Sequence, residues 1–206
     1  MSKNIFLVGG SHGIGLAMAK VLSKDHKVYV ASRTAEELSS LPVTHIPFDA
    51  LSDDLAVDQL PDEIHGFVYC PGSINLKPFK MVTLDSFRAE MEVNFFALVN
   101  VAKMIIPKMV EGSSAIFFST VAVGSGMPFH TSIAAAKGAI EGFAKSLAAE
   151  YAPKIRVNCI APSLVDTPLA QRLLNNDKKR ELMAQRHPLK RVGTPEDIAQ
   201  MAIFLL

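Results

Sequence analysis

The stretch NIFLVGGSHGIG, residues 4–15, carries the strongest signal for the fold of this chain. An apolar run at 4–10 leads into a glycine-rich turn at 9–15, which opens a segment with helical spacing. Glycines in such a turn let the backbone bend tightly and approach a pyrophosphate at the N-terminus of the helix. The spacing Gly9-x-x-x-Gly13-x-Gly15 differs from G-x-G-x-x-G, so a plain glycine-rich turn remains an alternative.

The rest of the chain repeats this alternation of apolar runs and helical segments. Further strands are expected at 27–33, 44–50, 66–72, 114–120 and 155–162, and helices at 13–24, 52–60, 84–110, 131–151 and 195–206. The runs are apolar almost throughout, which is typical of strands buried on both faces of a parallel sheet. The pattern predicts an α/β fold with a doubly wound parallel sheet, Rossmann-type, in a single domain over residues 1–206. The polar segment 166–190 is expected to form a helical excursion or lid.

Composition narrows the class of protein. Hydrophobic residues make up 49% of the 206 residues and the net charge is +1, which favours a packed core over disorder. This charge gives no electrostatic reason to expect nucleic acid or a membrane as partner. The N-terminus enters a strand pattern directly and no apolar run reaches membrane-spanning length, so a cytoplasmic protein is expected. Cys70 and Cys159 are expected to be buried free thiols, and no metal site is expected.

The end of the second expected strand bears on the choice of cofactor. A dinucleotide fold reads the adenosine ribose there, with an acidic residue for the 2′-hydroxyl of NAD or an arginine for the 2′-phosphate of NADP. The chain has Ser32 and Arg33 at this point and no Asp or Glu, and His12 can add positive character. These residues predict that NADP(H) is preferred over NAD(H). A solvated charge at a strand end is the alternative for Arg33.

Several downstream blocks share the order of one known family. Asp49 follows the third expected strand, Asn94 lies in EMEVNFFA, Thr120 in FFSTVA, and Lys137 in the segment HTSIAAAKGA. With the glycine turn, IRVNCIAPSLVDTPL and HPLKRVGTPEDIAQMAIFLL, they resemble the short-chain dehydrogenase/reductase family over nearly the whole chain.

The resemblance implies a role for each matched residue. Thr120 stands where a serine orients the substrate, Lys137 would bind the nicotinamide ribose, Asn94 would hold a relay water, and Asp49 would contact adenine. The cofactor-binding residues implied by the turn and the resemblance together are Gly9, Ser11, His12, Gly13, Ile14, Gly15, Ser32, Arg33, Asp49, Gly72, Lys137, Pro162, Val165 and Thr167.

Some positions depart from the family pattern. The resemblance implies a proton-donating tyrosine four residues before Lys137, but this chain has Ile133, whose side chain cannot exchange a proton. His130, Ser132 or Tyr69 could replace it, although helix neighbours of Ile133 point about 100° away. Further departures are Tyr69-Cys70-Pro71-Gly72 in place of N-N-A-G and Ser163 in place of a glycine, and the given sequence stops at Leu206, before the last strand that family members commonly carry. His187 is expected to be a surface or hinge residue and not a catalyst.

Three functional interpretations follow. The first is an NADP(H)-binding oxidoreductase that transfers hydride between nicotinamide and a small carbonyl or alcohol, with a weakened active site. The second is a catalytically silent dinucleotide-binding protein, and the third treats Ile133 as an introduced change. Apolar residues that are either a substrate pocket wall or core packing are Met127, Phe129, Leu164 and Leu169.

A homodimer or homotetramer is also expected. The helices at 84–110 and 131–151 carry apolar residues on more than one face, which usually indicates a second partner. These residues are Phe95, Phe96, Val99, Met104 and Ile105 on the first helix, and Ile140, Phe143 and Leu147 on the second. In the family that the chain resembles, these two helices pack between subunits.

Overall fold

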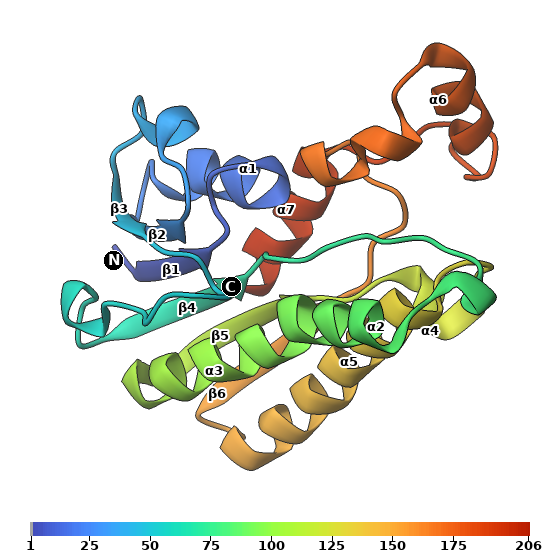
Figure 1. Cartoon of the computed structure of the whole chain (residues 1–206). Coiled ribbons are helices and arrows are strands. Elements are labelled where there is room, and N and C mark those ends of the chain that lie inside the picture. Colours follow the sequence, from blue (N-terminus) through green and yellow to red (C-terminus); the bar gives the residue numbers. More distant parts are fainter. Residues whose placement is uncertain (1) are drawn as a thin grey trace.

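A computed structural model describes residues 2–206 and contains one six-stranded parallel sheet (Figure 1). The strands are β1 (Asn4–Val8), β2 (Lys27–Ser32), β3 (Val43–Pro47), β4 (Ile64–Tyr69), β5 (Met109–Phe118) and β6 (Ile155–Ile160). Their order in the sheet is β3-β2-β1-β4-β5-β6. From β1 to β3 the strands are added toward one edge of the sheet, and from β4 to β6 they are added toward the other edge, so the strand order reverses between β1 and β4. This confirms the predicted doubly wound α/β fold and places a ligand-binding crevice at the reversal.

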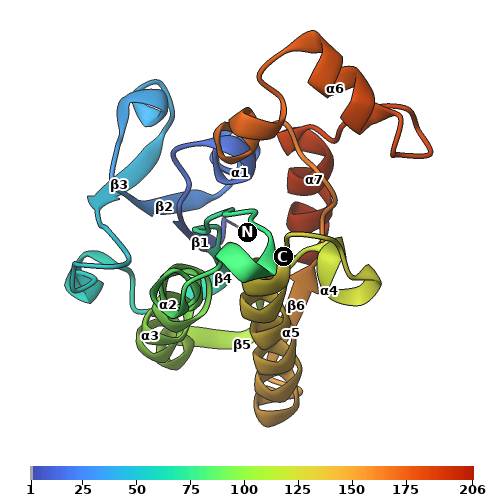
Figure 2. The same ribbon diagram turned by 45° about the vertical axis from the view of Figure 1, so that its right-hand side comes forward.

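Helices cover both faces of the sheet (Figures 1 and 2). One face carries α1 (Gly13–Leu22) and α7 (Pro195–Leu205), and the other carries α2 (Leu84–Met91), α3 (Ala97–Ile105) and α5 (Thr131–Tyr151). Alternate side chains of the strands fill two apolar layers: Phe6 and Phe67 stack beneath α3 and α5, whereas Ile5 and Leu7 pack with α1 and α7. Both faces of β1 are therefore buried, as its unbroken apolar sequence predicts.

The prediction of one continuous helix over residues 84–110 is wrong. A π-helical turn, Glu92–Phe96, separates α2 from α3, and a 3₁₀ turn at Ile106–Lys108 follows. Pro107 has no backbone N–H to continue the helical ladder, which ends the helix here. Strand β5 consequently begins at Met109, five residues before the expected start.

The helix expected at 52–60 is also wrong, because only Val57–Gln59 form a 3₁₀ turn. The chain just before it forms a turn, in which the Asp49 side chain accepts the N–H of Leu51 and the Asp53 side chain accepts the N–H of Asp49. Leu55 is buried against the core instead of lying on a helix face.

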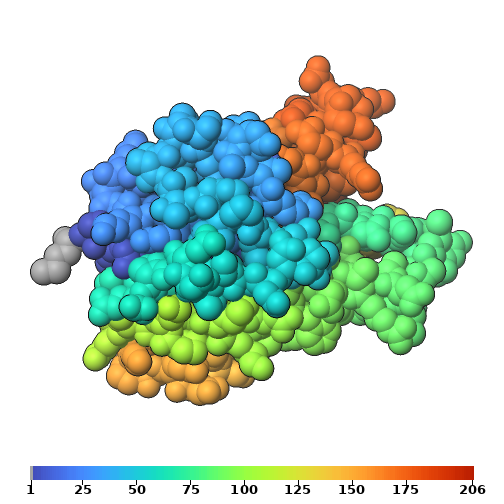
Figure 3. Space-filling model, turned by 60° about the vertical axis from the view of Figure 1, so that its left-hand side comes forward, coloured from blue at the N-terminus to red at the C-terminus, as the bar shows by residue number. Residues whose placement is uncertain are grey.

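Segment 166–190 contains a 3₁₀ helix, Pro168–Leu173, and α6 (Asp177–Ala184). It projects from the body of the molecule, as the orange lobe of Figure 3 shows. An ion pair between Arg180 and Asp166 joins α6 to the start of the segment. Movement of this segment as a lid remains a prediction.

The apolar residues expected on two faces of the long helices mostly face the interior. Ile105 and Ile140 are buried in the core, and the rings of Phe95 and Phe143 pack edge to face with centroids 6.0 Å apart. Phe96 is the exception, with 47% of its surface exposed. The others, Phe95, Val99, Met104, Phe143 and Leu147, are half-buried in the single chain, so a second apolar face that packs against a partner stays a prediction. Within residues 2–206, no helix is both long and apolar enough to cross a membrane.

Candidate active site

A cavity of about 1310 Å³ lies at the carboxyl ends of the strands, where the strand order reverses. Its wall comes from the turn after β1, the loops after β2, β3, β4 and β6, the end of β5, α5, and segment 166–190. The predicted site residues that line it are Gly9, Ser11, His12, Gly13, Ile14, Gly15, Ser32, Arg33, Asp49, Gly72, Thr120, Ile133, Lys137, Pro162, Val165 and Thr167. The structure thus brings these residues together around one space.

The glycine turn leaves room for a ligand at the start of α1. Gly9 and Gly13 have φ angles of 77° and 53°, a region that glycine adopts without strain. A Cβ on Gly15 would lie 2.5 Å from the carbonyl oxygen of Gly9. His12 precedes α1 without a side-chain cap, and the first turn contains no acidic residue. The free N–H groups at this helix N-terminus suit an anion such as a pyrophosphate.

The charges around the cavity are mainly positive. Among the lining residues in the described chain 2–206, Asp49 is the only acidic one, whereas Arg33, Lys137 and Arg186 are basic. Arg33 is exposed at the end of β2, and no ion pair engages it within the described residues. A ligand that carries phosphate groups matches this charge distribution.

At the other end of the cavity, Ile133 and Lys137 lie one helical turn apart on α5. Ile133 is 4% exposed and belongs to neither apolar core cluster. Burial lowers the pKa of Lys137 to about 8, opposed by the nearby Cys159 and Cys70 thiols and by Glu90. The ammonium form therefore still predominates at neutral pH. Thr120, the N-cap of α4 (Val121–Ser125), accepts a hydrogen bond from Ala122 N at 3.3 Å.

Asn94 lies behind the cavity wall and does not line the cavity itself. It is fully buried in the π-helical turn, where its Nδ2 donates to the backbone oxygen of Glu90 at 2.9 Å and to Ser73 Oγ at 3.0 Å. Its Oδ1 accepts from Ser73 N at 3.2 Å. These contacts hold the loop after β4 in place, and the expected role of Asn94 in holding a water stays a prediction.

Sequence reasoning missed Glu90 and Ser73. Ser73 lines the cavity, and its hydroxyl donates to Glu90 Oε1 at 3.1 Å. Glu90 is only 4% exposed, and burial raises its pKa, against the hydrogen bond from Ser73 and the charge of Lys137. The one available signal was spacing, since Glu90 lies four residues before Asn94 and shares its helix face.

Comparison with known proteins shows which family the chain belongs to. A short-chain dehydrogenase family model described as Enoyl-(Acyl carrier protein) reductase matches residues 8–206. The chain belongs to the short-chain dehydrogenase/reductase family. The 3-oxoacyl-[acyl-carrier-protein] reductase FabG of Chlamydia muridarum is 33% identical, with 100% of this chain and 90% of that protein covered.

Solved structures of other short-chain dehydrogenases share the fold. A family member from Francisella tularensis superposes with a TM-score of 0.90 at 25% identity, covering 100% of this chain and 91% of the other. An actinorhodin polyketide ketoreductase solved with NADPH has a TM-score of 0.88 at 20% identity, covering 99% and 89%. The second likeness concerns the fold alone.

Three side chains of this short-chain dehydrogenase/reductase are candidates, from the sequence, to donate a proton in place of Ile133. Tyr69 is 2% exposed, does not line the cavity, and has a pKa that burial raises. Ser132 is 3% exposed and also lies outside the lining. His130 does line the cavity, and its Nδ1 lies 2.7 Å from the backbone oxygen of Pro128. Of the three, only His130 reaches the space where a substrate would lie.

His187, expected from the sequence to be a surface or hinge residue, is half-buried, and its role as a hinge stays a prediction. It lines the cavity, and its Nδ1 is 2.9 Å from the carbonyl oxygen of Met183. Because a carbonyl only accepts, Nδ1 carries the hydrogen and Nε2 accepts from Ser163 Oγ at 2.8 Å. This contact joins segment 166–190 to the loop after β6.

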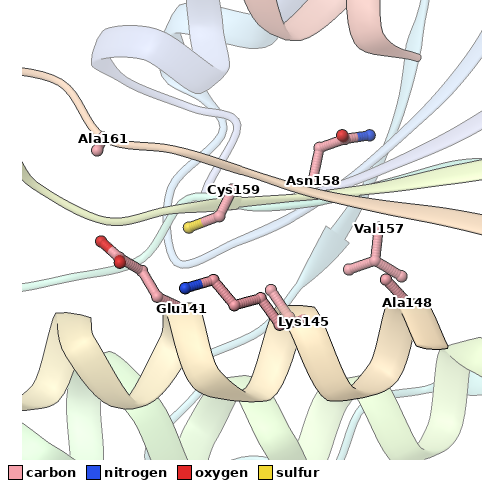
Figure 4. Close-up of a pocket in the computed structure, with 8 residues that line it drawn as sticks. Glu141, Lys145, Ala148, Val157, Asn158, Cys159 and Ala161 are labelled. Carbon is pink, nitrogen blue, oxygen red and sulfur yellow. The ribbon is translucent and has the colours of Figure 1, made fainter. Parts of the chain in front are cut away.

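A second cavity, of about 490 Å³, lies between α5 and β6. Figure 4 shows Glu141 and Lys145 extending from α5 toward the thiol of Cys159 on β6. Burial raises the pKa of Cys159 to about 11 and that of Cys70, in the main cavity, to about 12. Both cysteines are free, as expected, although they are only partly buried. Neither thiol is poised to act as a nucleophile at neutral pH.

Proposed function

We propose that this protein is an NADP(H)-linked oxidoreductase that transfers hydride between nicotinamide and a small carbonyl or alcohol. The observation that carries the proposal is the shape of the main cavity, which runs from the bare N-terminus of α1 to Lys137 and Thr120. When bound, the reduced nicotinamide supplies the hydride for the carbonyl carbon. The chain supplies binding, orientation and a proton.

The residues at each end of the cavity would bind a different part of the cofactor. The N–H groups of the glycine turn would hold the pyrophosphate, and Arg33 would pair with a 2′-phosphate. Asp49, beside the loop after β3, would contact the adenosine end. Lys137 would hold the nicotinamide ribose, with Pro162, Val165 and Thr167 along the nicotinamide.

The other lining residues support an apolar carbonyl substrate. Phe129 and Leu169 line the cavity while 54% and 48% exposed, so they form a pocket wall and are not core packing. Met127 and Leu164 line the same cavity. The relative FabG is named for reduction of 3-oxoacyl groups, which combine a ketone with an acyl chain. A short ketone with an aliphatic tail is the first substrate class to test.

Calorimetry with both cofactors tests the cofactor choice. A charge-assisted contact to phosphate contributes about 1.5–3 kcal/mol, so NADPH should bind about tenfold or more tightly than NADH. Arg33→Ala should remove this difference. Arg172→Ala, an exposed arginine outside the cavity lining, should leave it unchanged. Equal dissociation constants for both cofactors in the unmodified protein would refute the NADP(H) preference.

Turnover is then measured with protein and NADPH at equal concentration, against a panel of ketones that includes 3-oxoacyl thioesters. A decrease of NADPH absorbance that depends on the ketone supports the oxidoreductase proposal. NADPH binding without oxidation across the whole panel would refute it.

A further inference from the structure

The buried Glu90 and its half-buried partner Ser73 have no role in the reaction expected from the sequence. The π-helical turn brings Glu90 of α2 and Asn94 onto one face, toward the loop after β4. Ser73 connects this buried group to the cavity, because its hydroxyl contacts both Glu90 and Asn94 while the residue lines the cavity. A buried carboxyl group is thus one hydroxyl away from the space beside Lys137.

The hydrogen bonds of Ser73 depend on the state of Glu90. A serine hydroxyl has one hydrogen to donate and two lone pairs that accept. Asn94 Nδ2 fills one lone pair at 3.0 Å. When Glu90 is ionised, it accepts the Ser73 hydrogen. When Glu90 is protonated, it can donate to the second lone pair, and the Ser73 hydrogen is then free to turn into the cavity.

Two observations favour the protonated form of Glu90. Its Oε2 is buried and has no hydrogen-bond partner among the described residues, which would be costly for a charged oxygen. Burial is also the largest influence on its pKa and raises it. The one charged group that opposes this is Lys137, which faces Glu90 from α5 and lowers that pKa.

We propose that Glu90 and Ser73 form a proton relay that delivers a proton to the carbonyl oxygen at a site where Ile133 cannot. The inference rests on the proposed oxidoreductase function. Ser73 is the group that touches substrate, and Glu90 acts through it.

In a carbonyl reduction, every proton that the relay moves has a donor and an acceptor. As hydride reaches the carbonyl carbon, the carbonyl oxygen takes the Ser73 hydroxyl proton and becomes an alcohol. Ser73 Oγ takes the carboxyl proton of Glu90 in the same step. Glu90 is left as a carboxylate, and water from the solvent returns its proton. For alcohol oxidation the same protons move in reverse.

Glu90→Gln tests the relay with little change in shape, because an amide can hydrogen-bond to Ser73 but cannot transfer a proton. The matched control is Glu92→Gln, an exposed glutamate two residues further along. The rate of NADPH oxidation in a single turnover should fall about 10²–10⁴-fold in Glu90→Gln and in Ser73→Ala. Both variants should bind NADPH within about threefold of the unmodified protein, and the control should match it throughout.

The pH profile separates a relay from a structural role. In the unmodified protein, the reduction rate should fall as pH rises through the pKa of Glu90, because only the protonated carboxyl can donate. Glu90→Gln should lack this fall. A rate in Glu90→Gln equal to that of the unmodified protein would overturn the relay while leaving the oxidoreductase function intact.

Infrared spectroscopy of the protein with NADPH gives a readout that does not depend on turnover. The expected result is a protonated carboxyl band that persists above the ordinary pH range of a glutamate in the unmodified protein and is absent in Glu90→Gln. Absence of that band down to about pH 5, near the ordinary pKa of a glutamate, would overturn the relay. No turnover in the unmodified protein would instead overturn the oxidoreductase proposal, and the relay with it.

Discussion

Gly15→Ala should abolish cofactor binding while the chain still folds. The added Cβ would lie 2.5 Å from the carbonyl oxygen of Gly9 and 2.9 Å from the Cα of Gly10. Both are backbone atoms, so the turn between β1 and α1 must shift to relieve the overlap. Overpacking of this kind costs about 1–3 kcal/mol. The shift moves the N–H groups that would hold the pyrophosphate.

Thermal unfolding with and without NADPH measures this effect. A ligand at 100 times its dissociation constant stabilises a protein by about 2.7 kcal/mol, which for a chain of this size raises the Tm by roughly 5–11 °C. The unmodified protein should show this rise and Gly15→Ala should not. Gly124→Ala is the control, because a Cβ there meets nothing within 4 Å, and it should keep the full rise. An unchanged NADPH-dependent rise in Gly15→Ala would refute the assignment of the turn to the pyrophosphate.

Three further predictions address the reacting end and the assembly. Ile133→Tyr should raise the rate of NADPH oxidation with a suitable ketone by up to about 10²–10⁴-fold. The gain should be smaller if Glu90 already donates the proton. Loss of folding in this variant would show that residue 133 is part of the core. The pKa of Lys137, about 8 in the folded protein, lies below its ordinary 10.5. Across that range the unfolded chain binds more protons, so the unfolding free energy of the unmodified protein should rise with pH relative to Lys137→Met, by at most about 3 kcal/mol in denaturant titrations. A pH-independent difference would contradict this. Light scattering should show a homodimer at micromolar concentration that Phe96→Asp weakens, whereas a particle of 22.3 kDa in the unmodified protein would count against it.

The sheet was predictable because its strands are buried on both faces. Runs such as 4–10 and 66–72 are apolar almost throughout, and this pattern located all six strands, although β5 begins five residues before its expected start. Local sequence did not reveal the break at Glu92–Phe96, where the helical period continues although the hydrogen bonds change. In the segment 52–60 the apolar spacing resembles that of a helix, but only Val57–Gln59 form a 3₁₀ turn.

The parts of the candidate site that consist of residues close together in the sequence were predictable. The glycine turn, the strand end at Arg33 and the spacing of Ile133 and Lys137 all come from short motifs. The contacts of Ser73 with Glu90 and of Ser163 with His187 join residues 17 and 24 positions apart. Tertiary packing sets such contacts, so the sequence alone revealed neither the contact of Ser73 with Glu90 nor that of Ser163 with His187.

The pairing of β1 with β4 has a consequence for synthesis of the protein in the cell. Strand β1 is complete at Val8, but its partner β4 does not begin until Ile64, and the cavity wall extends to His187. Ribosomes add about 5–20 residues per second, so roughly 10–40 s separate the first cavity residue from the last. The edge of β1 that pairs with β4 lacks its neighbour until β4 has been synthesised, and the cavity lacks part of its wall until His187 has been added. The nascent chain should therefore depend on chaperones until nearly all of it has emerged.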